Sequence, residues 1–427
     1  MTANGIARVV SVGGFFLLFP GFVIYHYFIS ASIIPPVAGG LFGPVALVLA
    51  VIYLTLLPLN LRGLLQANSL YTVVVAGFLL YVLLITLAHY ASYNLSFIQL
   101  AGKQSFGVIV FWISLFFLGF YLPHQSRFLQ VGSFICAAAI TGFLVYYVAT
   151  TGSLFFYAAE LYGVEEGVAT YQGFARSSLG LWALLVVTAR GEFYRWFMVV
   201  SGIFVLFVLG ARSELFAFMT LSLLLMLAIG MRSIKALFFS LIASGVIIAL
   251  VIGNLDSLME SRQLQILDLR ASSSWNAREV LEEEAWEVIK ANPIWGSFGS
   301  HVARGTIGSY AHNYLSAWEN YGLIGVTSYL MLTLVACAVG AYRCFGSSRH
   351  YSVAWLLSFV VNAICLLLIL VSKPVFWPLV AFGWGLHAKA AGQLQTEPRL
   401  SPSPARPAAR ARTNPLTNTI PKAQAPQ

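Results

Sequence analysis

The sequence predicts an all-α polytopic membrane protein with about twelve transmembrane helices. Hydrophobic residues make up 59% of the 427 residues and charged residues only 9%, a composition that excludes a soluble globular domain. Apolar runs of about 17 to 25 residues recur from end to end, and each could cross the ~30 Å hydrocarbon core of a bilayer. These runs do not alternate between apolar and polar residues, so a transmembrane β-barrel is also excluded.

The predicted spans divide the chain into four regions. Residues 1–253 hold nine spans, 254–312 form a long loop, 313–392 hold three more spans, and 393–427 form a tail. The first run is too long for a signal peptide, so we expect it to remain as a span. The sixth and seventh runs are short, so one of them could be re-entrant. The spans are expected at 9–30, 38–58, 70–90, 105–123, 128–150, 177–188, 196–210, 214–230, 236–253, 313–341, 352–371 and 374–391.

Basic residues predict that both termini face the cytoplasm. On that side, ten lie near the membrane, namely Arg8, Arg62, Arg127, Arg190, Arg195, Arg232, Lys235, Arg343, Arg349 and Lys389. Short loops on the other side hold four, namely Lys103, Arg176, Arg212 and Lys373, as the positive-inside rule requires. The tail is rich in Pro, Ala and Arg and is predicted to be disordered. The net charge of +9 therefore reflects topology and this tail, and nothing predicts nucleic-acid binding.

The loop at 254–312 is the one predicted soluble segment, and loops of this length usually have a function. Asn276 and Glu279 have the spacing of a capping box and predict the start of a helix. One apolar face would be formed by Leu281, Ala285, Val288 and Ile289. Asn292-Pro293 would end the helix. We therefore expect an amphipathic helix of about fifteen residues that lies on the membrane or caps a cavity.

Arg176 and Arg212 are charges at the predicted outer membrane interface. A charged side chain at membrane depth usually marks a functional site. The guanidinium fork matches phosphate oxygens, so two arginines at one end of a bundle predict a site for a diphosphate or another anion. Alternatively, each arginine reaches the lipid headgroups or pairs with Glu214, Glu165 or Glu166.

His312 and Glu319 lie where the tenth span would begin. They are seven residues apart, close to two helical turns, so we expect them on one face of a helix about 10 Å apart along its axis. The helix dipole would keep His312 neutral, and a neutral histidine in a water-filled vestibule could act as a general base. The alternative is a hydrogen-bonded structural histidine.

No metal or cofactor is predicted. The four cysteines fall in predicted spans or a cytoplasmic loop, so neither a disulfide framework nor a cysteine-ligated metal is indicated. His301 and His312 are eleven residues apart and lack the spacing of a metal-binding motif.

The stretch "AHNYLSAWENYGLIGV" resembles the H-N-x-x-L-x-x-x-x-E-x-G-x-x-G signature of the O-antigen ligase and polymerase superfamily. The matching residues are His312, Asn313, Leu315, Glu319, Gly322 and Gly325. Two other segments are similar to family motifs, "NAREVLEEEAWEVIKANPIWGSFG" with shifted spacing and "LGARSELFAFMTLSLLLML" with Glu214 where a small residue is usual. The resemblance covers about residues 165 to 345.

The resemblance implies a GT-C-like bundle in the bacterial inner membrane, with a metal-independent, inverting glycosyltransferase site that faces the periplasm. The donor would be a glycan on undecaprenyl diphosphate, and the acceptor another lipid-linked glycan or lipid A core. His312 would be the catalytic base, and Arg176, Arg212 and then Arg278 would bind the diphosphate. Asn313 and Glu319 would support the site. A chain-length regulator protein is a further candidate partner.

Two alternatives stay open on the sequence. The chain could polymerise repeats of O-antigen or exopolysaccharide, which we favour slightly, or ligate the glycan to lipid A core. A transporter or flippase of lipid-linked glycans is the second class. A transporter predicts inverted repeats and charges at the membrane midplane, and the sequence suggests neither.

Overall fold

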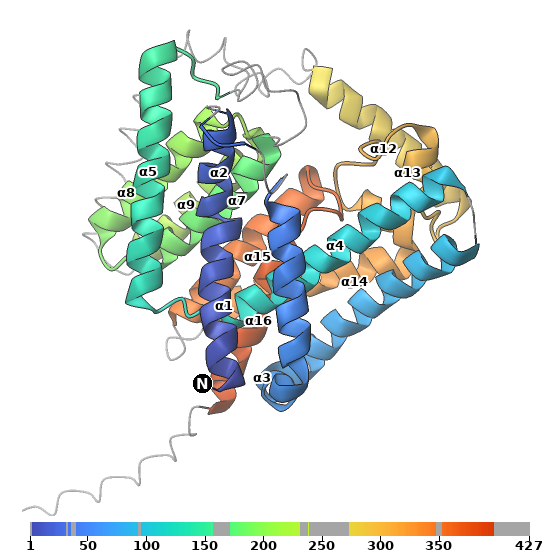
Figure 1. The fold of residues 1–427 in the computed structure, drawn as a ribbon, viewed down its shortest axis with the longest axis horizontal. Coiled ribbons are helices and arrows are strands. Elements are labelled where there is room, and N and C mark those ends of the chain that lie inside the picture. The colour runs from blue at the N-terminus through green and yellow to red at the C-terminus, as the bar shows by residue number, and fades with distance from the viewer. Residues whose placement is uncertain are drawn as a thin grey trace, which may run out of the picture.

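A computed structural model describes residues 2–30, 33–35, 40–92, 95–156, 171–230, 238, 273–346 and 352–396. Every regular element in these ranges is a helix (Figure 1). The all-α class predicted from the sequence is therefore confirmed. A helix satisfies all its backbone hydrogen bonds internally, which is why apolar runs of this length take this form in lipid.

Seven helical segments are long and apolar enough to cross a membrane. The first consists of α1 (Ala3–Leu18) and α2 (Pro20–Ser30), which are separated at Phe19 because Pro20 has no amide hydrogen to continue the helix. Two more lie in α3 (Phe42–Ser92), which turns back on itself in Figure 1. The seven are Ala3–Ile29, Phe42–Leu61, Leu70–Ser92, Ser96–Tyr121, Arg127–Thr151, Leu315–Gly346 and Val353–Val371.

Four of the other predicted spans correspond to helices that do not meet this criterion. These are α7 (Tyr171–Thr188), α8 (Glu192–Val208), α9 (Arg212–Gly230) and α16 (Leu379–Thr396). For example, α8 has 17 residues, fewer than the ~20 that usually cross a bilayer. The span predicted at 236–253 lies outside the described residues, apart from Phe238. The count of twelve therefore stays a prediction.

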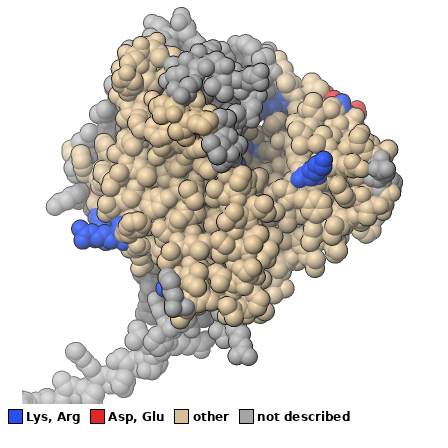
Figure 2. Space-filling view, in the orientation of Figure 1, with Lys and Arg blue, Asp and Glu red and all other residues tan. Residues whose placement is uncertain are grey.

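The centre of the molecule is a close crossing of α4 (Ser96–Tyr121) and α16. A Cβ atom at Gly119 would meet the carbonyl oxygen of Phe382, and one at Gly385 would meet that of Phe116. Small residues of this kind let helix backbones approach closely in membranes. Beside this crossing lie buried aromatic rings, including Trp112 and Trp384. Among the described residues, the face visible in Figure 2 is mostly uncharged, with a few Lys and Arg side chains on it.

The helix predicted in the long loop is present as α12 (Ser273–Ala291). It begins three residues before Asn276, so the capping role predicted for Asn276 is wrong, and it ends before Asn292-Pro293 as expected. Ala285 and Ile289 of its predicted apolar face are buried against Ala311 and Leu315. This face therefore fixes α12 to the start of α14 (Leu315–Ala341).

The remaining helices complete the bundle. They are α5 (Arg127–Thr151), α13 (Ser300–Arg304), the π-helical turn η2 (Tyr342–Gly346) and α15 (Val353–Val371). α14 and α15 run in opposite directions, so the start of α14 and the end of α15 lie at the same end of the molecule. The residues predicted to act as a site gather at that end.

Candidate functional site

His312 lies in the loop that precedes α14, three residues before its first residue, Leu315. The side-chain oxygen of Asn313 accepts a hydrogen bond from the backbone nitrogen of Leu315 at 3.0 Å, which orders the turn that leads into the helix. The expectation that His312 and Glu319 share one helical face is therefore wrong, because the helix starts only after His312.

A second loop is tied to this one. Ser316 Oγ donates a hydrogen bond to the carbonyl oxygen of Asn313 at 2.7 Å and accepts one from the backbone nitrogen of Val375 at 2.8 Å. The segment that follows α15 is therefore held against the start of α14. This contact brings Lys373, which the sequence placed only in a short outer loop, close to the predicted site.

Together, α12 and the His312 loop line a half-open cavity of about 300 Å³. Arg278, His312 and Asn313 line it, so three predicted site residues come together. Glu279, Glu282 and Glu283 also line it, as do Trp275, Trp286 and Val371. The cavity therefore combines a base, a cation, carboxylates and aromatic rings, a mixture that can bind a polar ligand with several hydroxyl groups.

His312 is held neutral in this cavity. Burial lowers its pKa from 6.5 to about 4, and the positive charges of Arg278 and Lys373 act in the same direction. The dipole of α14, invoked from the sequence, is not among these causes. The ring of Tyr310 lies beside the imidazole, with 5.3 Å between the ring centroids. At neutral pH the imidazole can therefore accept a proton.

Lys373 forms a buried ion pair with Glu214 of α9. The distance from Lys373 Nζ to Glu214 Oε1 is 2.6 Å, and the two side chains are 3% and 2% exposed. The sequence suggested Glu214 as a partner for Arg176 or Arg212, but in the structure its carboxylate pairs with Lys373. No local pattern could have found this pair, because the two residues are far apart in the sequence.

The arginines predicted to bind diphosphate are distributed over three helices. Arg176 of α7 stacks on Phe42, with 3.6 Å between the guanidinium carbon and the ring centroid, and it feels the charge of Glu214. Its buried Nε atom has no hydrogen-bond partner among the described residues. Arg212 is the first residue of α9, two residues before Glu214. Its side chain is not free, because it makes a polar or ring contact. Of the three arginines, the structure places Arg278 alone in the His312 cavity.

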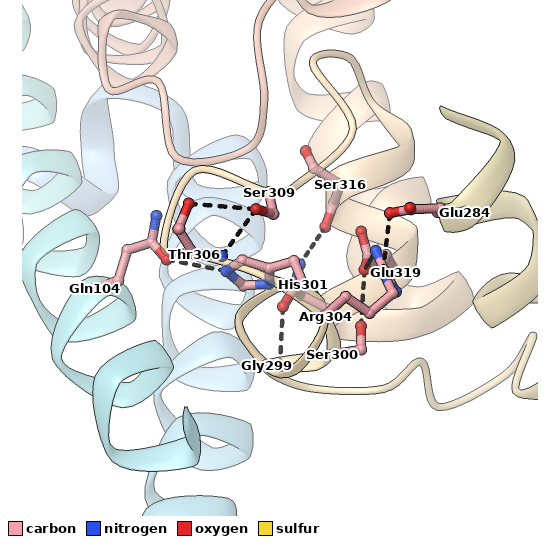
Figure 3. Close-up of polar contacts among 11 residues, drawn as sticks. Gln104, Glu284, Gly299, Ser300, His301, Arg304, Thr306, Ser309, Ser316 and Glu319 are labelled. Atoms are coloured by element: carbon pink, nitrogen blue, oxygen red, sulfur yellow. Dashed lines mark hydrogen bonds and ion pairs between the residues drawn. The ribbon is translucent and has the colours of Figure 1, made fainter. Parts of the chain in front are cut away.

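Glu319 lies outside this cavity and belongs to a separate polar network (Figure 3). Its Oε1 atom accepts hydrogen bonds from Arg304 Nη2 and from Ser300 Oγ, both at 2.7 Å. Arg304 also donates to Glu284 Oε2 of α12 at 3.3 Å. The network links α12, α13 and α14, so Glu319 anchors the surroundings of the site and does not face its interior.

Gly322 interrupts α14 where the loop at 292–299 packs against it. Its φ of 67° lies in the left-handed region. A Cβ atom there would meet the carbonyl oxygen of Ile294 and would lie 2.6 Å from the carbonyl carbon of Trp295. The backbone nitrogen of Leu323 donates to the carbonyl oxygen of Ile294 at 3.0 Å. Glycine is therefore required by both conformation and space.

Comparison with known proteins leaves the family open. No known family model matches the chain, and no curated protein matches it. Within the described residues, no group of three or more His, Cys, Asp or Glu side chains could hold a metal ion.

Proposed function

We propose that the chain is a membrane glycosyltransferase of the O-antigen polymerase and ligase type. It would transfer a glycan from undecaprenyl diphosphate to the hydroxyl group of an acceptor sugar. The observation that carries the proposal is the cavity in which a neutral His312 faces the cation Arg278, with Lys373 near it. The resemblance of "HNYLSAWENYGLIG" to the superfamily signature supports the same reaction.

In the proposed reaction, His312 takes the proton from the acceptor hydroxyl. The hydroxyl oxygen then forms a bond to the anomeric carbon of the donor, and the bond between that carbon and the diphosphate oxygen breaks. Undecaprenyl diphosphate leaves with the electron pair and with a growing negative charge. Arg278, which lines the cavity, would stabilise this charge, as fixed cations do in many transfer reactions, and Lys373 would add a weaker effect from nearby. Arg176 and Arg212 would hold the diphosphate from α7 and α9.

The proposal includes a location and an orientation. The enzyme would lie in the bacterial inner membrane with twelve spans and both termini in the cytoplasm. The cavity would face the periplasm, where the loop at 254–312 would cover it. Polymerisation of repeats is the favoured outcome, with a chain-length regulator as a candidate partner, and ligation to lipid A core is the alternative.

Substitution of His312 tests the proposal directly. The protein would be reconstituted with an undecaprenyl-diphosphate oligosaccharide in EDTA, and the products sized on a gel. We expect wild type to form a ladder and His312→Ala to lose about 10²- to 10⁴-fold in rate, the usual contribution of general base catalysis. His89→Ala is the matched control, because His89 is a half-buried histidine that does not line the cavity.

Two results would count against the proposal. Equal rates for wild type and His312→Ala would show that His312 is not the catalytic base. If wild type forms no product with either a glycan or a lipid A core acceptor, but moves lipid-linked glycan between leaflets, the chain is a transporter.

The pH dependence of the rate follows from the position of His312. Because the pKa of its imidazole is lowered to about 4, the base is unprotonated throughout the range from pH 8 to pH 5. We expect kcat/KM to stay level as the pH falls through 6.5 and to decrease only as it approaches 4. A decrease centred near pH 6.5 would show that the catalytic base is an exposed histidine and not this one.

A further inference from the structure

A second opening lies at the other end of the bundle from the His312 cavity. It is a groove of about 550 Å³ between the second span of α3, the C-terminal half of α14, and α15 and α16. Met331, Val335 and Arg343 line it from α14 and η2, whereas His312 precedes the first residue of α14. The two openings therefore lie at opposite ends of α14.

The walls of the groove are apolar and open to the surroundings. Leu70 and Val74 of α3 face Met331 and Val335 of α14 across it. Leu70 is 74% exposed and Met331 is 49% exposed, so these side chains contact whatever surrounds the helices. In a membrane-spanning bundle the surrounding molecules are lipids, and a groove of this shape fits an acyl chain.

The inner end of the groove carries polar groups that lack partners. His387 of α16 is 2% exposed and lies between the rings of Tyr71 and Trp355, at centroid distances of 4.5 and 5.6 Å. Its Nδ1 atom is buried and has no hydrogen-bond partner in the described part of the chain. The same is true of the Nε atom of Arg343, whose guanidinium lies over the ring of Trp355.

Buried polar atoms are nearly always satisfied in folded proteins, so these two indicate a missing ligand. The described lining of the groove contains one arginine and no carboxylate, so the ligand should be an anion. A phosphate group satisfies a guanidinium through charge-assisted hydrogen bonds, and an imidazole N–H could donate to the same group.

We propose that this groove is a binding site for an anionic phospholipid from the leaflet at this end of the bundle. Its phosphate would contact Arg343 and His387, and one acyl chain would lie along Leu70, Val74 and Val335. This site goes beyond the proposed glycan transfer and does not depend on it. The ligand is a resident lipid and not a substrate of the His312 cavity.

Native mass spectrometry of the full-length protein in detergent tests the site. Delipidated protein would be titrated with phosphatidylglycerol and, separately, with phosphatidylcholine. We expect wild type to prefer phosphatidylglycerol, and Arg343→Gln to weaken that binding about tenfold, because the charge-assisted hydrogen bond to the phosphate is lost. Val335→Trp fills the groove without changing the charge and should weaken binding of both lipids.

The control is Arg127→Gln. Arg127 is an exposed arginine at the start of α5 and does not line the groove. Its replacement should leave phosphatidylglycerol binding unchanged. The site is overturned if wild type binds both lipids equally, or if Arg343→Gln and Arg127→Gln weaken binding to the same extent, since either result describes general attraction to the surface. Size-exclusion profiles that match wild type would show that the variants are folded.

Discussion

Replacing Gly322 with alanine is expected to prevent normal folding. The new methyl group would overlap the carbonyl oxygen of Ile294 and approach the carbonyl carbon of Trp295 to 2.6 Å. Both are backbone atoms, so no side-chain rotation relieves the overlap. With ψ at −169°, the φ of 67° lies in a region that only glycine readily adopts, and this adds about 1 to 3 kcal/mol for a residue with a Cβ atom. Together these effects place Gly322→Ala among the exceptional substitutions that cost more than ~4 kcal/mol.

The measurement is the yield of monodisperse protein in detergent, followed by its melting temperature. Gly77→Ala is the matched control, because Gly77 lies in α3 and a Cβ atom there meets nothing within 4 Å. Alanine favours a helix over glycine by about 0.5–1 kcal/mol, so this control should melt at the wild-type temperature or slightly above it. A Gly322→Ala protein with the yield and melting temperature of wild type would contradict the kink in α14.

Breaking the pair between Lys373 and Glu214 is expected to have the second large effect. Each side chain is almost fully buried, so removing one leaves a buried charge without a partner. Lys373→Met and Glu214→Gln should each lower the free energy of unfolding by about 3–5 kcal/mol. The double variant should recover much of this loss, because it leaves neither charge behind.

Unfolding of all four proteins in the same detergent gives the coupling energy of the cycle. Additive losses would show that the two side chains do not interact. Arg127→Gln serves as the control again, because it replaces an exposed charge and should change stability by less than about 0.5 kcal/mol. If the double variant is stable but does not transfer glycan, then Lys373 acts in the reaction as well as in the fold.

Local sequence patterns were sufficient to predict where the helices lie and where some of them end. Apolar runs located the helices, seven segments of which are long and apolar enough to cross a membrane, and Asn292-Pro293 located the end of α12 correctly. The start of α12 was predicted at Asn276, three residues too late. The spacing of Asn276 and Glu279 matches a capping box, but the same spacing also occurs inside helices. The start of α14 was also misplaced by two residues, and this error put His312 on a helix that it only precedes.

The contents of the site depend on contacts that no local pattern contains. Lys373 comes near His312 because the loop after α15 bonds to Ser316, and it meets Glu214 only in the folded bundle. Arg278, placed second on the sequence, lines the cavity because the apolar face of α12 fixes that helix to α14. Glu319, predicted as a supporting residue, bonds to Arg304 of α13 and does not line the cavity.

The attachment of α12 also determines how often this helix leaves its place beside the cavity. To lift α12 away, the protein must expose Ile289 and separate Trp286 from Trp318, whose ring centroids are 5.8 Å apart. Exposing a buried isoleucine costs about 1.5–3 kcal/mol, and losing an aromatic pair costs about 0.5–1.5 kcal/mol more. A total of roughly 3 kcal/mol corresponds to about one open molecule in a hundred or fewer at any instant. The docked position of α12 is therefore the resting state, and a ligand would enter the cavity through its existing opening, with α12 in place.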